Sequence, residues 1–147
     1  MSKLRVGVQQ DTEVMQCEHK TTQVYCSAIS VAYSGVPAAV WEPLATLVLD
    51  ASYEATLLVG VKNTLRWMAT KPAGPAALPP VFLTLVGAGV FGNRLSWVSD
   101  AMGRAHDQVA ALGVPLNVVV LHYRAVNRTL VGHTDSFAKV GPSGPKP

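Results

Sequence analysis

The stretch Val81-Phe-Leu-Thr-Leu-Val-Gly-Ala-Gly-Val-Phe-Gly-Asn93 decides the fold of this chain. An apolar, β-rich run ends in three glycines within six residues, and a helical pattern follows. Glycines at such a junction leave main-chain N–H groups exposed at the start of a helix, where they can hold an anion such as a phosphate. The sequence therefore predicts a nucleotide-binding loop at residues 87–93.

Two parallel strands joined by a helix are expected around that loop. Residues 81–86 suit a central strand covered on both faces, and residues 97–112 carry apolar side chains at helical spacing. Gly113 is placed to end this helix, and residues 116–123 are predicted to form a second buried strand. The order strand, loop, helix, strand is a βαβ unit, which implies a parallel pair with a right-handed crossover.

The chain before the loop is expected to hold two strands and a long helical region. Residues 4–8 alternate apolar and polar and predict a strand that ends in a turn at residues 9–12, and residues 22–28 predict a second strand. Residues 37–68 have helical periodicity, as one helix or as two broken near Asp50. Four prolines make residues 71–80 a loop. A short helix within residues 124–137 and a flexible tail at 141–147 complete an α/β domain spanning residues 1–140.

Composition and charge exclude several classes of protein. The chain has 147 residues, of which 49% are apolar and 14% charged, as in a compact domain and unlike a disordered one. The net charge of +3 comes from scattered basic residues, so we expect no nucleic-acid partner. Cys17, Cys26 and the histidines match no zinc spacing. No signal-peptide pattern and no uninterrupted apolar run of about 18 residues occur, so we expect no membrane partner and a cytoplasmic location, with the nucleus left open.

One interpretation of the glycines is a dinucleotide-binding loop. Gly87-Ala-Gly-Val-Phe-Gly92 matches the pattern G-x-G-x-x-G between a strand and a helix. The acidic residue that should follow about twenty positions later is absent, because the next strand ends in His122-Tyr123-Arg124. An arginine there suits a 2′-phosphate, which keeps NADP open. However, Val90-Phe91 is bulky for this turn, and the remaining chain is short for a doubly wound fold.

Residues 51–123 resemble the second half of a macro domain, the ADP-ribose-binding module. The matching segments, in the family's order, are Ser52-Tyr53-Glu54-Ala55-Thr56-Leu57, the strand at 81–86, and Gly89-Val90-Phe91-Gly92. The chain is also similar to uncharacterised macro-like proteins with Gln-Val-Tyr/Phe-Cys-Ser-Ala and Gly-Gly-Gly/Ala-x-Phe-Gly-Asn segments. The resemblance implies a three-layer α/β/α sheet whose C-terminal part is the parallel βαβ unit.

The resemblance also assigns roles to individual residues. In macro domains the glycine loop wraps the diphosphate, and its aromatic residue lies along the distal ribose. Tyr123 is then placed to stack on adenine, Asp11 to recognise the base, and Asn93 to donate a side-chain N–H. Ser27 lies where macro domains continue with Asn-Ala-Ala-Asn. The implied ligand-binding residues are Gly87, Ala88, Gly89, Val90, Phe91, Gly92, Asn93, Tyr123, Asp11 and Ser27.

The first half of the chain departs from the family. Gln10 stands in place of the glycine of Gly-Asp-Ile-Thr, and Cys26-Ser27-Ala28-Ile29-Ser30 stands in place of the asparagine segment. These departures favour binding of ADP-ribose, free or on a modified protein, without turnover and without a required cofactor. The alternatives are an interaction module or homodimer with a degenerate pocket, a purely structural glycine turn, and a hydrolase of ADP-ribose conjugates that uses Ser27 or Asp11.

The remaining polar and aromatic residues have simpler interpretations. We expect His106 on an exposed helix face, His122 as a structural histidine, and Asp50 with Glu54 as ordinary helix-surface carboxylates. His19 and His133 stand far from the other histidines in sequence. The tryptophans, Trp41, Trp67 and Trp97, are expected to pack in the core.

Overall fold

The computed structural model describes residues 4–70, 78–126, 128 and 130–131. In chain order the elements are β1 (Gly7–Glu13), β2 (Lys20–Tyr25), the 3-10 turn η1 (Val31–Tyr33), α1 (Ala38–Thr70), β3 (Pro80–Thr84), α2 (Leu95–Ala110) and β4 (Asn117–Leu121). Residues 128, 130 and 131 are also helical. The predicted mixed α/β class is confirmed, whereas most of the predicted proline loop, most of the final helix and the tail lie outside the described residues. The predicted end of the proline loop is wrong by one residue, because Pro80 already belongs to β3.

The described strands form two separate pairs. β3 and β4 pair in parallel, with Leu83 opposite Val120, and α2 joins them as the βαβ prediction requires. β1 and β2 form an antiparallel hairpin that belongs to a different sheet. The single sheet of a three-layer arrangement is therefore not confirmed. The reason lies in β2, whose sequence Lys-Thr-Thr-Gln-Val-Tyr lacks the continuous apolar run of a strand buried on both faces.

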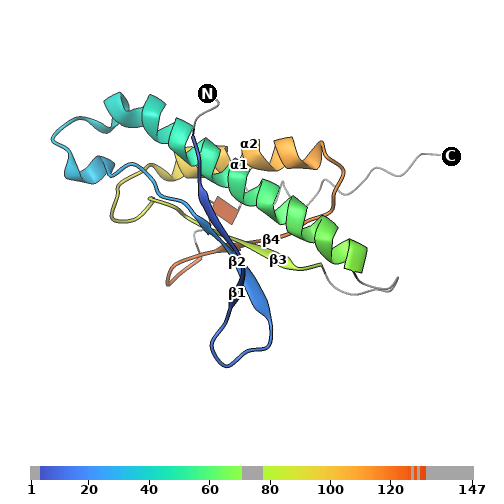
Figure 1. Ribbon diagram of the computed structural model, residues 1–147. Coiled ribbons are helices and arrows are strands. Elements are labelled where there is room, and N and C mark those ends of the chain that lie inside the picture. The colour runs from blue at the N-terminus through green and yellow to red at the C-terminus, as the bar shows by residue number, and fades with distance from the viewer. Residues whose placement is uncertain (1–3, 71–77, 127, 129, 132–147) are drawn as a thin grey trace.

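The helix α1 is continuous and lies beside α2, both on the same side of the β3–β4 pair (Figure 1). No break occurs near Asp50, because Ala45, Leu49, Tyr53 and Leu57 recur every fourth residue on one buried face. This face packs on the buried face of α2, which consists of Trp97, Val98, Ala101, Met102, Ala105 and Val109. The two helices thus share one core above β3 and β4.

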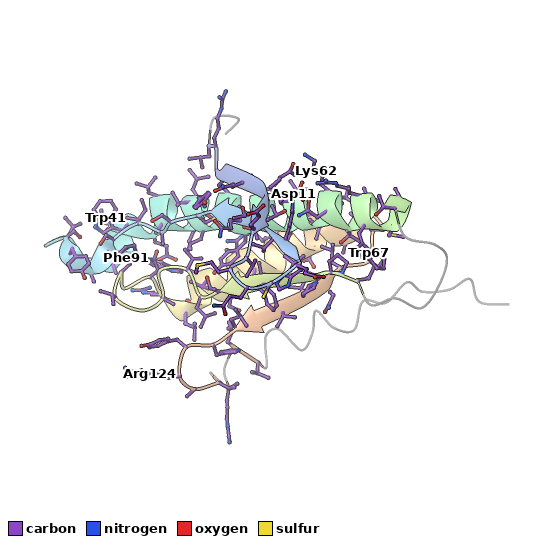
Figure 2. All side chains as sticks on the ribbon, turned by 60° about the horizontal axis from the view of Figure 1, so that its bottom comes forward. Asp11, Trp41, Lys62, Trp67, Phe91 and Arg124 are labelled. Atoms are coloured by element: carbon purple, nitrogen blue, oxygen red, sulfur yellow. The ribbon has the colours of Figure 1, made fainter. Side chains whose placement is uncertain are left out.

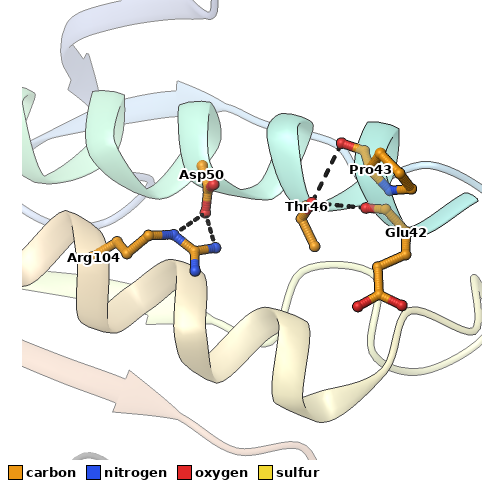
Figure 3. A network of polar contacts seen from close by, with 5 residues as sticks. All are labelled: Glu42, Pro43, Thr46, Asp50 and Arg104. Carbon is orange, nitrogen blue, oxygen red and sulfur yellow. Dashed lines mark hydrogen bonds and ion pairs between the residues drawn. The ribbon is translucent and has the colours of Figure 1, made fainter.

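Three local features fix α1 in place. Pro43 lies inside the helix without an N–H to donate, and the Thr46 hydroxyl donates to the carbonyl oxygens of Glu42 at 2.7 Å and Pro43 at 3.3 Å (Figure 3). Arg104 of α2 donates through Nε to Asp50 Oδ1 at 2.9 Å, and through its terminal nitrogen to the same oxygen. A Cβ on Gly60 would lie 2.7 Å from Val81, so this glycine allows the close approach of helix and strand.

By length and composition, α1 could also cross a membrane. An 18-residue window of this helix has a mean hydropathy of 1.5, and 39% of the window is buried inside the protein. Core helices of globular proteins meet the same criteria, and α1 supplies much of the core described above. Apolar side chains lie on the buried face of α1 and also at exposed positions such as Leu44, Leu58 and Leu65, which raises the mean hydropathy of the helix.

Several predicted boundaries are wrong. The first strand covers Gly7–Glu13 rather than residues 4–8, and the predicted turn at 9–12 lies within it. That segment contains an irregularity in register between Gln9 and Thr12, and Asp11 has a φ of 54°. The second strand ends at Tyr25, before the predicted end at residue 28. By contrast, Gly113 has a φ of 67° just after α2, which confirms the predicted end of that helix.

Candidate functional site

The site is built where β3 ends and residues 87–93, the glycine loop, begin. The Tyr53 hydroxyl donates to the carbonyl oxygen of Thr84 at 2.7 Å and accepts the main-chain N–H of Val86 at 3.1 Å. Burial raises the pKa of Tyr53 well above its ordinary value, against a smaller opposing effect of the Val86 N–H. The phenol therefore stays neutral and keeps the last residues of the strand joined to α1.

Two of the three glycines in the loop are required by its shape. Gly87 has a φ of 74°, and a Cβ there would lie 2.3 Å from the Cβ of Ala28. Gly92 has a φ of 71°, and a Cβ there would lie 2.8 Å from the Cβ of Ala32. Gly89 differs, because no atom lies within 4 Å of the position that its Cβ would take. Gly89 is thus the glycine with open space beside it.

Asn93 closes the loop from the inside. Its side chain is buried, and Nδ2 donates to the carbonyl oxygens of Ile29 at 2.8 Å and Gly87 at 3.2 Å. The main-chain N–H of Asn93 also donates to the Gly87 carbonyl oxygen at 3.0 Å. The side-chain N–H predicted to meet a ligand is therefore engaged within the protein. Oδ1 of Asn93 is buried without a partner in the described part of the chain.

The tip of the loop offers main-chain donors to solvent. Within residues 4–70 and 78–126, no acceptor contacts the N–H groups of Gly89, Val90 or Phe91, and all three residues are exposed. The helix α2 begins directly after the loop, with no side-chain cap at Arg94 and no acidic residue in its first turn. Consecutive free N–H groups beside the positive end of a helix dipole are an arrangement that favours an anion.

The segment after β2 lies against this loop, and it supplies an aromatic residue that the sequence prediction missed. The N–H of Ala32 donates to the carbonyl oxygen of Phe91 at 2.9 Å. The rings of Tyr33 and Phe91 meet edge to face, with centroids 6.4 Å apart and an interplanar angle of 74°. Tyr33 is 70% exposed, so its ring is free to meet a ligand. The one feature of the sequence that could have indicated Tyr33 as a site residue is its position in the segment that follows β2.

A cation also lies next to the loop. Arg94, directly after Asn93, approaches Glu42 of α1 at 3.7 Å and lies 5.3 Å from the centroid of the Trp97 ring. Both side chains of the ion pair are about half exposed, so water screens their attraction strongly. Arg94 was not among the predicted site residues, although its position just before a helix could have indicated it.

Tyr123 and Ser27 lie toward the same edge as the glycine loop. The carboxyl ends of the parallel strands β3 and β4 share one edge, and Tyr123 follows β4. Its ring is 82% exposed, and the Arg124 guanidinium lies 5.1 Å from the ring centroid. Ser27 precedes Ala28, which contacts the loop at Gly87, and its hydroxyl donates only to the Ala28 carbonyl oxygen at 3.4 Å.

Asp11 lies elsewhere in the molecule. Its carboxylate accepts from Arg66 near the end of α1 at 3.0 Å. Arg66 is 13 residues beyond Tyr53 along α1, or about 20 Å at 1.5 Å per residue. Figure 2 shows Phe91 and Trp41 at one end of the molecule and Asp11 nearer the middle of α1. The structure therefore does not bring Asp11 to the loop, and the base-recognition role predicted for it has no structural support.

A cavity of about 120 Å³ lies between β2, α1 and β3, beside the start of the loop. Its polar lining comes from Cys26, Ser52, Tyr53, Thr56 and Thr84, and its apolar lining from Val24, Phe82, Leu83 and Val86. The Cys26 thiol lies 3.6 Å from the Ser52 carbonyl oxygen and 3.5 Å from the Thr56 hydroxyl. Drug-sized ligands occupy about 300 to 1,000 Å³, so this cavity is too small to enclose a nucleotide.

The other polar and aromatic residues with a sequence-based prediction lie in structural surroundings. His106 is more buried than predicted, with a side chain that is 20% exposed and lies 3.4 Å from Asp107. Asp50 pairs with Arg104 rather than serving as an isolated surface carboxylate. Trp97 is buried in the core, Trp41 packs against it and donates to the Ser34 hydroxyl, and Trp67 is half-buried. The described residues contain no cluster of His, Cys, Asp and Glu able to hold a metal ion, and His133 lies outside them.

Comparison of the chain with protein-family models, with curated proteins and with solved structures found no match.

Proposed function

We propose that the protein binds the diphosphate of an ADP-ribose-like nucleotide at the glycine loop, as a divergent module of macro-like type. The observation that carries the proposal is the row of free N–H groups at Gly89, Val90 and Phe91, directly before the uncapped start of α2. A diphosphate supplies negative charge and acceptor oxygens, and these N–H groups have no acceptor of their own in the described part of the chain. Gly89 leaves room for its approach, because the space beside it is open.

The exposed aromatic rings beside the loop support a nucleotide over a bare anion. Phe91 lies in the loop, Tyr33 meets it edge to face, and Tyr123 follows β4 at the same edge. Aromatic faces bind sugars and bases through apolar contact and stacking. In this proposal Phe91 and Tyr33 contact the distal ribose and Tyr123 contacts the base, while Arg94 beside Trp97 and Arg124 beside Tyr123 add positive charge.

Binding without turnover is the form of the proposal that the loop surroundings favour. Hydrolysis of an ADP-ribose conjugate requires a general base or an activated nucleophile within hydrogen-bond distance of the bond that breaks. The Ser27 hydroxyl donates to the main-chain oxygen of Ala28, and Asp11 is held by Arg66 away from the loop. Glu42 pairs with Arg94, the residue directly after the loop.

The test is a thermal-shift titration of the full chain with ADP-ribose, NADP, ATP and inorganic diphosphate. A ligand at about a hundred times its Kd should add about 2.7 kcal/mol to the free energy of unfolding, which raises Tm by several degrees for a domain of this size. A shift with ADP-ribose supports the proposal. A shift with NADP alone would replace it with dinucleotide binding through Arg124, and no shift with any of the four would refute it.

Two variants with equal added charge locate the site. Gly89→Glu places a carboxylate at the free N–H groups without a steric clash, so it should keep Tm and abolish the ligand shift. Gln108→Glu on the exposed side of α2 is the matched control and should keep both. Ligand binding that survives in Gly89→Glu would move the site away from the loop.

A further inference from the structure

One face of α1 carries an apolar stripe with exposed valine and leucine side chains, between which Leu47, Ala51 and Ala55 are partly buried. Val40, Leu44, Leu58 and Leu65 are between 43% and 67% exposed. On a helix of 3.6 residues per turn these positions fall on a single side, opposite Ala45, Leu49, Tyr53 and Leu57. The full stripe consists of Val40, Leu44, Leu47, Ala51, Ala55, Leu58, Leu65 and Ala69, with Lys62 as its one charged member.

Such a stripe indicates a partner surface. Its side chains recur every three or four residues from the first turn of α1 to its last, all of them apolar except Lys62, and helix-to-helix packing uses this pattern. Ala51 and Ala55 in its middle are small enough to let another helix approach closely. Isolated exposed apolar residues are common on protein surfaces, but a continuous row along a 33-residue helix is not.

The charges beside the stripe favour a second copy of this chain in an antiparallel arrangement. Glu54 and Lys62 lie four residues before and after Leu58, or about 6 Å from it along the helix axis. With a two-fold axis at Leu58, Glu54 of each copy lies at the same position along the helix axis as Lys62 of the other copy, which gives two symmetry-related pairs of opposite charge. A parallel pair would instead place like charges level with each other, which is unfavourable.

We propose that the protein forms a two-fold symmetric dimer through the apolar stripe of α1, with the helices antiparallel and Leu58 at the axis. The stripe runs from Val40 to Ala69, or about 43 Å at 1.5 Å per residue, and is about 10 Å wide. Such a patch buries on the order of 800 to 900 Å² in total, at the low end for specific association. The dimer is therefore weak and depends on concentration, with a dissociation constant in the micromolar range or above.

A lipid surface fits the same stripe less well. Helices that lie on membranes carry apolar residues on one face and many lysines and arginines on the other, which attract anionic headgroups. The stripe of α1 has one lysine beside it, level with an acidic residue in the antiparallel arrangement, and the opposite face is buried in the core. In Figure 2, Lys62 lies on the upper side of α1, away from β3 and β4.

Sedimentation velocity of the full chain at about 1 to 200 μM tests the proposal. Wild type should change from monomer to dimer over this range. Leu58→Glu places two carboxylates together at the axis and should raise the dissociation constant roughly a hundredfold. Leu112→Glu, at an equally exposed leucine beyond α2, is the matched control and should dimerise like wild type. A wild type that stays monomeric, or a dimer that Leu58→Glu leaves intact, overturns the proposal.

Charge reversal tests the antiparallel register and does not depend on an apolar change. Glu54→Lys alone brings like charges level and should weaken the dimer about tenfold, and adding Lys62→Glu should restore it. Failure of the double variant to recover overturns the register. Flotation with vesicles of phosphatidylcholine and phosphatidylserine is the last arm: binding to vesicles by a protein that does not dimerise would assign the stripe to a lipid surface and refute the dimer.

Discussion

The hydroxyl of Tyr53, in the middle of α1, accepts the N–H of Val86, the residue just before the glycine loop, at 3.1 Å. The same oxygen donates to the Thr84 carbonyl at 2.7 Å, and that carbonyl also accepts the Val86 N–H at 3.0 Å, so one buried hydroxyl contacts two main-chain groups at the end of β3. The loop therefore begins from a fixed point, although its tip is exposed. This contact links the core of the helices to the candidate site.

Replacing Tyr53 with phenylalanine should destabilise the protein by about 0.5 to 1.5 kcal/mol, because the hydrogen bonds of the phenol with Thr84 and Val86 are lost, whereas the Val86 N–H and the Thr84 carbonyl oxygen keep their contact with each other at 3.0 Å. Urea unfolding followed by circular dichroism measures the change. Tyr25→Phe is the control, since its hydroxyl contacts exposed glutamines and its loss should change the free energy of unfolding little. Equal effects of the two substitutions would contradict the role assigned to Tyr53.

Stability should fall at alkaline pH for the same reason. The pKa of Tyr53 is raised in the folded protein above its ordinary value of 10.0, so the unfolded chain loses this proton first. The contribution of Tyr53 to the free energy of unfolding is complete below about pH 10 and declines above it, by at most about 1.4 kcal/mol per pH unit. Urea unfolding of wild type and Tyr53→Phe at about pH 9 and about pH 11 should show a smaller decline in the variant. Parallel declines in the two proteins would show that other groups cause the effect.

The glycines of the loop should respond differently to alanine. Gly87→Ala forces a left-handed φ on alanine and a contact of 2.3 Å with Ala28, so it should cost about 2 to 5 kcal/mol. Gly89→Ala meets no atom and should change stability by less than about 1 kcal/mol, with a gain expected from the stiffer unfolded chain. Thermal and urea unfolding of both variants provide the comparison. A Gly89→Ala variant as unstable as Gly87→Ala would mean that the open space beside Gly89 does not exist.

The ion pair between Asp50 and Arg104 should contribute little. Both side chains are at least one third exposed, so water screens the pair, and Asp50→Asn should cost about 1 kcal/mol or less. A double-mutant cycle with Arg104→Gln, repeated in about 1 M salt, measures the coupling and its screening. A coupling well above 1 kcal/mol that persists in salt would indicate a far less hydrated pair than the structure shows.

Local patterns predicted the second half of the fold well. The apolar run, the glycines and the helical period between residues 81 and 121 depend on neighbours in sequence, and the parallel β3–β4 pair with α2 between them was confirmed. The helical period of residues 37–68 was confirmed, and the structure shows one continuous α1, which was one of the two alternatives that the sequence left open. The first half was predicted less well, because the length of β1 depends on its partner β2 and on the irregularity at Asp11, and neither is visible as an alternation of apolar residues.

The candidate site shows the same division. The strain at Gly87 and Gly92 could be predicted, because positive φ is a local property of glycine. The contact of Tyr33 with Phe91 and the pairing of Asp11 with Arg66 join residues more than fifty positions apart. A resemblance in the second half of the chain could not place these partners, since the first half follows a different sequence.

The hairpin of β1 and β2 has a consequence for how the protein opens. Its residues are mostly exposed, and its side chains are held to α1 by the exposed Asp11–Arg66 pair and by the contacts of Cys26 just beyond β2. A two-stranded sheet with so little burial is marginal by itself. We expect its amide hydrogens to exchange with solvent deuterium through local openings, orders of magnitude faster than those in the middle of α1, which exchange only when the whole domain unfolds. The chain would then behave as one cooperative unit, formed by α1, α2, β3 and β4, with a hairpin that detaches and returns while that unit stays folded.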